Sequence, residues 1–309
     1  MADTKKKKAA KKKKAGQSEL PSRRERILRS VVRPSLLLPV ALIGAGVALF
    51  PAFRTVLPDL STRPEYQLRT ADIVIPDPPR WIPSDLASKV LHDAGLPEEV
   101  SVLQPDLVEK IHAAFVKHPW IQAPVEVRSS VPARIEVVFE YRQPVAMVEV
   151  SDGFYPVDDE GVLLPPGDFP PSELDRYPRI AGMRSPPVGG LGAAWGDARV
   201  IGAARLAVVL MPYWEEWKLK AIDVPTRQRA DQKYEDLEFT VTTQGGSRII
   251  WGRAPGNNHP LEVTDEKKVR RLKDFLAKGK TFDGNWEINI NHIVNEITRR
   301  QLTSRDRPR

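Results

Sequence analysis

The sequence predicts an α+β protein that begins with a transmembrane helix. Three observations indicate this class: an uncharged run from Pro34 to Phe53, two segments with helical apolar spacing followed by two with alternating spacing, and a second half made mostly of short alternating segments. We expect a small domain of two helices on a short sheet, then a mostly antiparallel β-domain with flanking helices. The predicted divisions are a basic tail over residues 1–33, the transmembrane helix over 34–53, a linker over 54–67, the small domain over 68–143, the β-domain over 144–299 and a basic C-terminal tail over 300–309.

The uncharged run is bounded by Arg33 and Arg54 and is twenty residues long. At about 1.5 Å per residue, a helix of this length spans about the 30 Å of a bilayer's hydrocarbon core. The alternatives are a buried core helix and a cleaved signal peptide. A signal peptide normally starts close to the beginning of the chain, whereas a long charged segment comes first here. We therefore predict a retained membrane anchor in contact with the lipid bilayer.

The residues before Pro34 are strongly basic. They carry thirteen lysines and arginines against three acidic side chains, a net charge of +10. Because the whole chain carries +7, the residues from Pro34 onward carry −3. The positive-inside rule then predicts a disordered cytoplasmic tail, with Leu60 onward outside the cytoplasm of a single-pass inner-membrane protein. A lysine run of this kind can also bind nucleic acid or anionic lipid, but the acidic remainder gives no support for a nucleic-acid partner.

The composition of the chain excludes some kinds of chemistry. There is no cysteine, so a disulfide framework, a thiol nucleophile and a zinc–cysteine site are all excluded. The five histidines are scattered without a second ligand at metal spacing, and no nucleophile-elbow motif occurs. Asp158-Asp159-Glu160 could hold a hard cation, but a solvated turn is the simpler interpretation. We predict no enzyme activity, no catalytic or metal residues and no cofactor.

Residues 54–67 form a proline-marked spacer, and Leu68 to Ile75 alternates weakly enough to suggest a strand. Ser84 is placed to cap a helix over residues 85–94, and Gly95 follows that helix. A second helix is expected over residues 106–117, where Leu107, Ile111 and Phe115 recur at helical spacing before His118-Pro119. The spacing then changes to two for a pair of strands around residues 125–128 and 135–140.

After Pro144 the sequence predicts consecutive hairpins up to residue 164. Two further helices are expected, over residues 197–210 and from Thr264 to about Ala277. Further strands are predicted over residues 219–224, 237–242, 247–251, 286–290 and 293–298.

A combination of motifs in the middle of the chain resembles the FtsQ/DivIB family of bacterial cell-division proteins. The residues that carry the resemblance are Pro119, Trp120, Val125, Val127, Arg128, Pro132, Ile135, Val137 and Pro144, followed by the Asp158-Asp159-Glu160-Gly161 turn. With Phe115, they are also ordinary core and turn positions: Pro119 ends a helix, Trp120 can bury a large ring, and Pro132 suits a turn. They therefore identify a fold and no active site. The segment 72–76 departs from the family in lacking a glycine.

The resemblance implies a POTRA domain over residues 68–143 and an FtsQ-type β-domain over residues 144–299. It also implies a non-enzymatic membrane scaffold of the divisome, which links early and late division proteins at the septum and binds small FtsB/FtsL-like coiled-coil proteins. The alternatives are a POTRA-containing factor for protein transport or outer-membrane assembly, and a cell-wall-binding anchor. Transport factors usually carry tandem POTRA units and a long β-barrel, and this chain has too few residues for both.

In that family the last strand is an open edge that receives a strand from the partner. The matching residues here are Val294, Asn295, Glu296, Ile297 and Thr298. The charges of Glu296 and Arg299 suit an edge that resists indiscriminate pairing. The alternative is a C-terminal helix starting at Ile293, because Ile293, Ile297 and Arg300 also have helical spacing.

Overall fold

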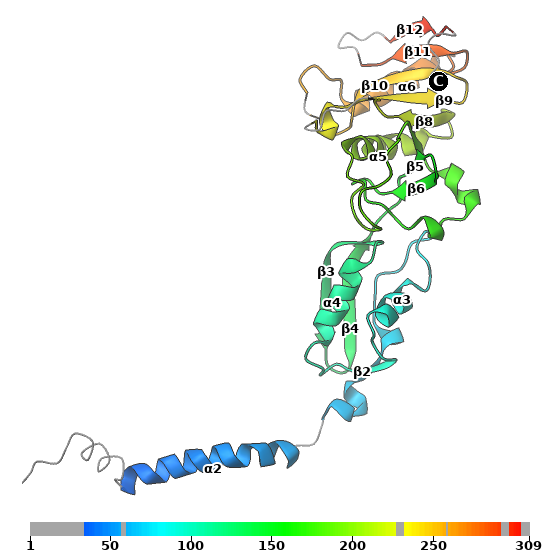
Figure 1. Ribbon diagram of the computed structural model, residues 1–309. Helices are drawn as coiled ribbons and strands as arrows, with labels where there is room; N and C mark the ends of the chain where they lie inside the picture. Colours follow the sequence, from blue (N-terminus) through cyan, green and yellow to red (C-terminus); the bar gives the residue numbers. More distant parts are fainter. Residues whose placement is uncertain (1–33, 57–59, 227–231, 258, 292–296, 304–309) are drawn as a thin grey trace, which may run out of the picture. The chain divides into compact units, whose positions relative to one another are not determined.

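The computed structural model describes residues 34–56, 60–226, 232–257, 259–291 and 297–303, with side chains in the first range limited to residues 38–50 (Figure 1). The chain divides into two compact units, residues 1–59 and residues 60–309. In the first unit the described element is helix α2 (Pro34–Val56). The basic segment before Pro34 lies outside the described residues.

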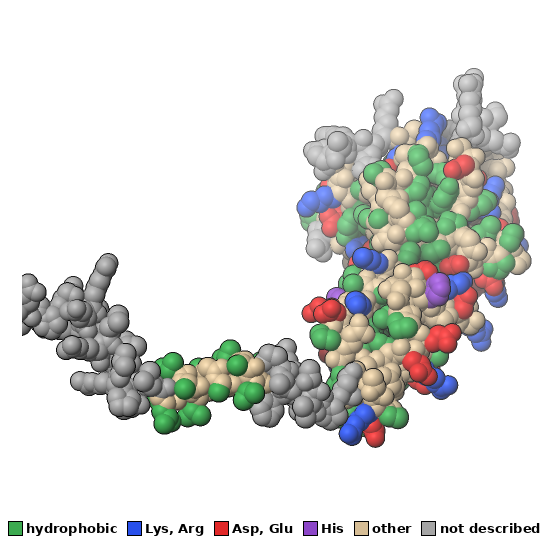
Figure 2. All heavy atoms as spheres, turned by 60° about the horizontal axis from the view of Figure 1, so that its bottom comes forward, with side chains coloured by type: hydrophobic (Ala, Val, Ile, Leu, Met, Phe, Trp, Pro, Cys, Tyr) green, Lys and Arg blue, Asp and Glu red, His purple; other side chains and the backbone are tan. Residues whose placement is uncertain are grey.

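The prediction of a transmembrane helix over Pro34 to Phe53 is wrong by this structure. Within the described part of the chain, no helix combines the length and the apolar character needed to cross a membrane. The side chains of α2 that are described, from Leu38 to Phe50, are exposed, and the apolar ones are visible in Figure 2.

The second unit begins with a helical lobe, which we define as residues 60–144. Its elements are η1 (Leu60–Thr62), η2 (Pro64–Tyr66), β1 (Gln67–Arg69), η3 (Thr70–Asp72), α3 (Leu86–Asp93), β2 (Glu99–Ser101), α4 (Leu107–Lys117), β3 (Ile121–Ser130) and β4 (Arg134–Tyr141). Strands β1 and β2 form one antiparallel pair and β3 and β4 another. Two helices therefore accompany short sheets, in the order that the sequence suggests.

Helices α3 and α4 are amphipathic and bury one face each. The buried residues recur every three or four positions, which places them on one side of each helix. They are Leu86, Val90 and Leu91 in α3 and Leu107, Ile111 and Phe115 in α4. Helix α3 begins after Asp85 rather than Ser84, and no side-chain hydrogen bond caps it.

The strand expected over Leu68 to Ile75 is interrupted. β1 ends at Arg69, and the 3-10 turn η3 follows before Val74 forms an isolated parallel bridge with Glu136 of β4. The Val74 N–H donates to the Ile135 carbonyl over 3.0 Å, and the Val137 N–H donates to the Val74 carbonyl over 2.8 Å. The segment thus pairs first with β2 and then with β4. The alternation of residues along the sequence cannot show this change of partner, so the segment looks like one strand.

The sheet lobe, residues 145–303, contains one sheet of eight strands. Its elements are β5 (Ala146–Val150), β6 (Gly153–Val157), η4 (Pro166–Asp168), η5 (Pro171–Arg176), β7 (Arg179–Ala181), α5 (Ala198–Leu210), η6 (Met211–Tyr213), β8 (Leu219–Asp223), η7 (Tyr234–Asp236), β9 (Glu238–Thr243), β10 (Arg248–Arg253), α6 (Asp265–Ala277), β11 (Trp286–Asn289) and β12 (Thr298–Gln301). The strand order is β12-β11-β10-β9-β8-β7-β5-β6.

The sheet is mixed, so the expectation of a mostly antiparallel β-domain with an anchor in front of it is wrong. Three neighbouring pairs are parallel, namely β5 with β7, β7 with β8, and β10 with β11. Parallel neighbours require a long crossover, usually through a helix. Helix α5 lies in the connection between β7 and β8, and α6 in that between β10 and β11. The predicted flanking helices are therefore the crossovers that make these pairs parallel.

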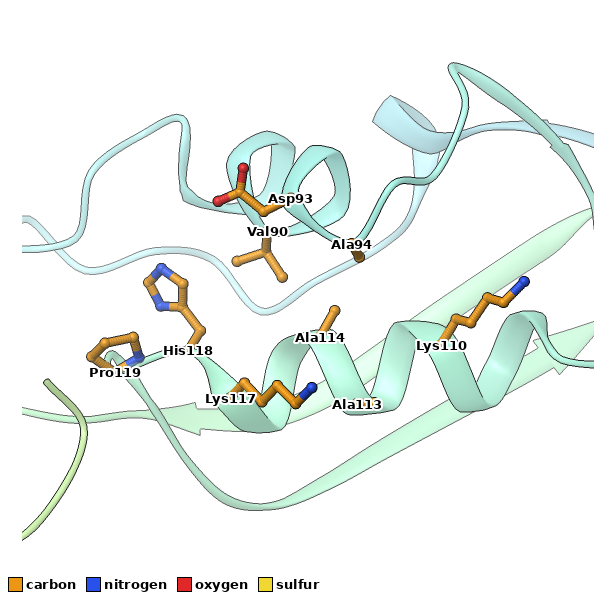
Figure 3. Close-up of a pocket in the computed structure, with 9 residues that line it drawn as sticks. All are labelled: Val90, Asp93, Ala94, Lys110, Ala113, Ala114, Lys117, His118 and Pro119. Atoms are coloured by element: carbon orange, nitrogen blue, oxygen red, sulfur yellow. The ribbon is translucent and has the colours of Figure 1, made fainter. Parts of the chain in front are cut away.

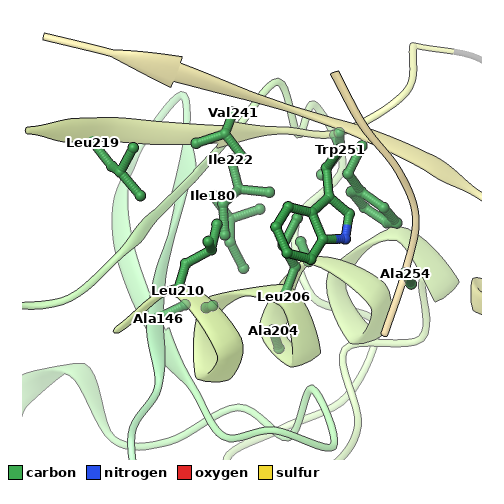
Figure 4. Packing of buried hydrophobic residues seen from close by; sticks show 14 of the residues in the cluster. Ala146, Ile180, Ala204, Leu206, Leu210, Leu219, Ile222, Val241, Trp251 and Ala254 are labelled. Carbon is green, nitrogen blue, oxygen red and sulfur yellow. The ribbon is translucent and has the colours of Figure 1, made fainter. Parts of the chain in front are cut away.

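The core of the sheet lobe lies between the strands and α5 (Figure 4). Leu206 and Leu210 of α5 are buried, as are Ile180, Ile222 and Trp251 of the strands. Small residues bring the helix close to the sheet. A Cβ at Gly202 would lie 2.6 Å from the ring of Phe239, so that position admits no larger side chain without movement.

Candidate functional site

The outermost strand of the sheet lobe is β12, and it is the candidate interaction site. In the described chain it pairs only with β11, in antiparallel register from Trp286 opposite Gln301 to Asn289 opposite Thr298. All four of its residues are exposed. Figure 1 shows β12 at one end of the sheet, next to β11. An exposed edge strand presents backbone groups that another chain can pair with.

The register shows which backbone groups of β12 face outward. The Leu302 N–H donates to the Asn285 carbonyl over 2.7 Å, so these two residues form a hydrogen-bonded pair. Such pairs recur every second residue in an antiparallel ladder. Thr298 and Arg300 therefore direct their backbone groups toward β11, whereas Arg299 and Gln301 direct theirs away from the sheet. The outward groups of these two residues are the ones that an added strand would use.

Side chains of β12 are held by β11. The guanidinium of Arg299 lies 3.5 Å from the centroid of the Trp286 ring, which is a cation–π contact. Arg300 forms an ion pair with Glu287, with 3.2 Å between nitrogen and oxygen. The half-buried Ile297 packs against the core of the sheet lobe. These contacts fix a short strand that the backbone ladder alone would hold weakly.

The structure describes only part of the predicted edge. Ile297 comes directly before β12 and Thr298 is its first residue, while Val294, Asn295 and Glu296 lie outside the described residues. The observed strand runs from Thr298 to Gln301, so it includes residues assigned from the sequence to a basic tail. Residues 297–303 contain no described helical segment. Arg299 was already expected on this edge from its charge, whereas Gln301 was missed because an amide side chain carries no apolar alternation.

The motif residues of the helical lobe lie in its core and at its turns. Phe115, Trp120, Ile135 and Val137 are buried, together with Val125. The remaining motif positions are the half-buried Pro119 and Val127, the buried Pro144, and the exposed Arg128 and Pro132. Arg128 forms an exposed ion pair with Glu126 on its own strand. The set is a core with its turns, and it brings no catalytic groups together.

Trp120 also joins the two lobes. Its indole Nε1–H donates to Asp168 Oδ2 over 2.7 Å, and its ring lies 5.8 Å from that of Phe169, centroid to centroid. Phe169, Met147 and Leu164 belong to the same buried cluster as Trp120. The sheet lobe thus supplies part of the covering of the helical lobe's core.

A buried ion pair forms a second junction. Arg142 Nη1 lies 2.6 Å from Asp158 Oδ2 and 3.2 Å from Glu160 Oε2. Asp158 is 2 % exposed, and its Oδ1 accepts the backbone N–H groups of Glu160 and Val162 over 3.0 and 2.8 Å. Burial raises the pKa of Asp158, and the hydrogen bonds from Val162 and Arg142 oppose that rise.

The expectation that Asp158-Asp159-Glu160 is a solvated turn is therefore wrong for Asp158, which is buried. The Asp158 carboxylate contacts the Arg142 guanidinium and the turn's own backbone. Across the described residues, no group of three or more His, Asp and Glu side chains could hold a metal ion. In the sequence, an aspartate at the start of a tight turn indicated this junction. Its partner Arg142, sixteen residues earlier, gave no such signal.

The buried Lys268 belongs to a hydrogen-bonded network near the start of α6. Lys268 is fully buried, and its Nζ lies 2.5 Å from Glu262 Oε1 and 5.0 Å from the centroid of the Trp251 ring. Glu262 also accepts from the Arg253 N–H and from Asn291 Nδ2, each over 3.0 Å. Burial lowers the pKa of Lys268, and the contact with Glu262 opposes that decrease. The network connects β10, α6 and Asn291, two residues after the end of β11.

Comparison with known proteins gives no family, since no family model and no curated protein matches the sequence.

Proposed function

We propose that this chain is a non-enzymatic scaffold of bacterial cell division, of the type that the FtsQ/DivIB resemblance implies. It binds a small coiled-coil protein, similar to FtsB or FtsL, through the open edge of its eight-stranded sheet. The observation that carries the proposal is β12, which is exposed along its length and pairs on one side only within the described chain. The motif residues of the helical lobe support the assignment to this type.

Recognition at this edge is β-augmentation. The partner contributes an extended segment whose backbone pairs with the outward N–H and C=O groups of Arg299 and Gln301. Arg299 and Arg300 are held in place by Trp286 and Glu287, so they present an ordered basic edge. A partner segment with acidic side chains beside its pairing residues complements this edge.

Proline substitution separates backbone pairing from side-chain contact. Arg299→Pro and Gln301→Pro each remove one outward N–H, and proline is tolerated on an edge strand where its nitrogen faces solvent. Arg299→Ala and Gln301→Ala are the matched controls, because they keep both N–H groups. With tagged full-length chain as bait in cells that express it naturally, we expect small coiled-coil proteins to copurify with the alanine variants and to be lost from both proline variants.

Thermal melting of each variant provides the second measurement. A cooperative melt of the proline variants shows that the sheet lobe is still folded when the partner is lost. The proposal is refuted if the proline variants retain the same partners as the alanine variants, or if the captured proteins have no coiled-coil sequence.

A further inference from the structure

The helical lobe contains a groove that the proposed function does not use. It lies between α3 and α4 and has a volume of about 390 Å³ (Figure 3). Ala94 after α3 and Ala113 and Ala114 of α4 line it, with the buried Val90 below. Alanine side chains end at Cβ, so the two helices leave apolar space between them. The volume falls within the roughly 300–1,000 Å³ of ordinary ligand pockets.

Two lysines of α4 flank this groove. Lys110 and Lys117 both line it, and both are exposed. Seven residues separate them, which is about two turns and about 10.5 Å along the helix. Neither ammonium group forms an ion pair with any described residue. Asp93 is the acidic residue that lines the α3 side, so cationic groups outnumber it.

His118 lies at the Pro119 end of the groove (Figure 3). The Trp120 N–H donates to His118 Nδ1 over 3.4 Å, so the ring accepts at Nδ1 and carries its proton on Nε2. Burial lowers the pKa of His118, although Asp168 and Asp93 oppose that decrease. Burial therefore favours the neutral imidazole at this end of the groove.

We propose that this groove binds an acidic amphipathic helix from a partner protein. The ligand carries carboxylates at positions i and i+7 and an apolar side chain such as leucine at i+3 or i+4. This spacing repeats that of Lys110, the two alanines and Lys117, so each carboxylate meets a lysine while the apolar side chain enters the space above Ala113 and Ala114. Helices that lie in grooves are recognised through this set of positions. The site is separate from β12 and does not rest on the proposed function.

Fluorescence anisotropy with a designed peptide tests the proposal. The probe is a labelled helical peptide of about 15 residues, long enough to form a helix, with glutamates at i and i+7 and leucines at i+3 and i+4. One control peptide has glutamine in place of both glutamates, and another has alanine in place of both leucines. We expect the glutamine control to bind the full-length chain about tenfold more weakly, since two exposed ion pairs together contribute roughly one factor of ten. The alanine control is expected to bind at least about tenfold more weakly, because it loses the apolar contact of both leucines with the groove.

Protein variants locate the binding site. The double variant Lys110→Gln with Lys117→Gln is expected to lose about tenfold in affinity for the glutamate peptide, whereas Lys278→Gln, at an exposed lysine of the sheet lobe, changes nothing. All variants keep the lysine-rich segment before residue 15, so any binding there is common to them. Ala114→Phe fills the groove and is expected to abolish binding while the chain still melts cooperatively. If that variant fails to fold, Ala113→Leu fills it from a more exposed position.

Three results would overturn the inference. The first is equal affinity for the glutamate and glutamine peptides, and the second is undiminished binding by the groove-filling variant. The third is binding of vesicles of phosphatidylserine and phosphatidylcholine that depends on Lys110 and Lys117 while the peptide does not bind, which would identify the ligand as an anionic membrane surface.

Discussion

Replacing Arg142 by methionine tests the junction between the two lobes. Methionine keeps much of the side-chain volume and leaves the backbone contacts of Arg142 in place, namely the N–H donated to Trp120 and the carbonyl that accepts from Trp81. What disappears is the charge beside Asp158, whose carboxylate is 2 % exposed. Removing one partner of a buried ion pair costs about 3–5 kcal/mol of unfolding free energy, because the other charge stays buried.

The pH dependence separates a buried charge from simple loss of packing. Burial already raises the pKa of Asp158 above its unfolded value, and Arg142 holds it down. Without Arg142 the pKa rises further, so the folded variant binds a proton that the unfolded chain has released. The unfolding free energy that the variant loses relative to the original chain is then largest at pH values above the raised pKa. This loss becomes smaller as the pH falls through that pKa.

Urea denaturation of the full-length chain, followed by tryptophan fluorescence at about pH 8 and about pH 5, measures both effects. Adding Asp158→Asn to Arg142→Met removes the buried, unpaired carboxylate charge and keeps a side-chain oxygen that can accept the turn's N–H groups. The double variant is therefore expected to be more stable than Arg142→Met alone. A deficit below about 1 kcal/mol, or one that is the same at both pH values, would refute the reasoning.

Two further substitutions test buried side chains by the same measurement. Trp120→Ala is expected to cost about 3–5 kcal/mol, because the ring is fully buried and its indole hydrogen bond to Asp168 is also lost; a loss under about 1 kcal/mol would show that the ring contributes little. Lys268→Met is expected to cost about 3–5 kcal/mol because it leaves the Glu262 carboxylate buried without its cation, and Glu262→Gln in the same chain should recover part of that loss; no recovery would mean that the deficit comes from packing.

The helices of the fold were predictable because their signals are local. Helix α4 begins at Leu107 and ends at Lys117, almost as predicted, since its apolar residues repeat at helical spacing and His118-Pro119 stops it. Helix α5 ends at Leu210 as expected, and Asp197 accepts the Arg199 N–H at its start. In both cases residues within one or two turns decide the structure.

Strand pairing was less predictable because partners lie far apart in the sequence. β2, at Glu99–Ser101, has no apolar alternation of its own and exists because β1 pairs with it. The parallel pairing of β10 with β11 depends on α6 returning the chain to the same edge. A single sequence shows where strands can form, but it does not show whether a neighbour runs in the same direction.

Of the residues that the sequence assigns to the candidate edge, the structure describes Ile297 and Thr298, and Thr298 is the first residue of β12. The apolar alternation near Ile297 is the reason for the strand predicted over residues 293–298. The described strand β12 consists of Thr298 to Gln301, whose side chains are polar and charged. Exposed edge strands are often charged, which removes the periodic signal that identifies a buried strand. The Arg142–Asp158 pair was missed because its charges look like surface residues in the sequence.

The strand order has a consequence for how the chain is made. From β7 to β12 each new strand is added beside the preceding one, and only β6 lies outside this order. The antiparallel neighbours β9 and β10 are joined by a short turn, whereas the parallel pairs β7–β8 and β10–β11 require the crossovers through α5 and α6, which slows their formation. Domains generally fold as units during synthesis. β12 is the last described strand of the sheet along the sequence, so the ribosome makes Arg299 and Gln301 after all the strands behind them. The outward backbone groups of these two residues therefore come to lie on a sheet edge only once the rest of the sheet has been made.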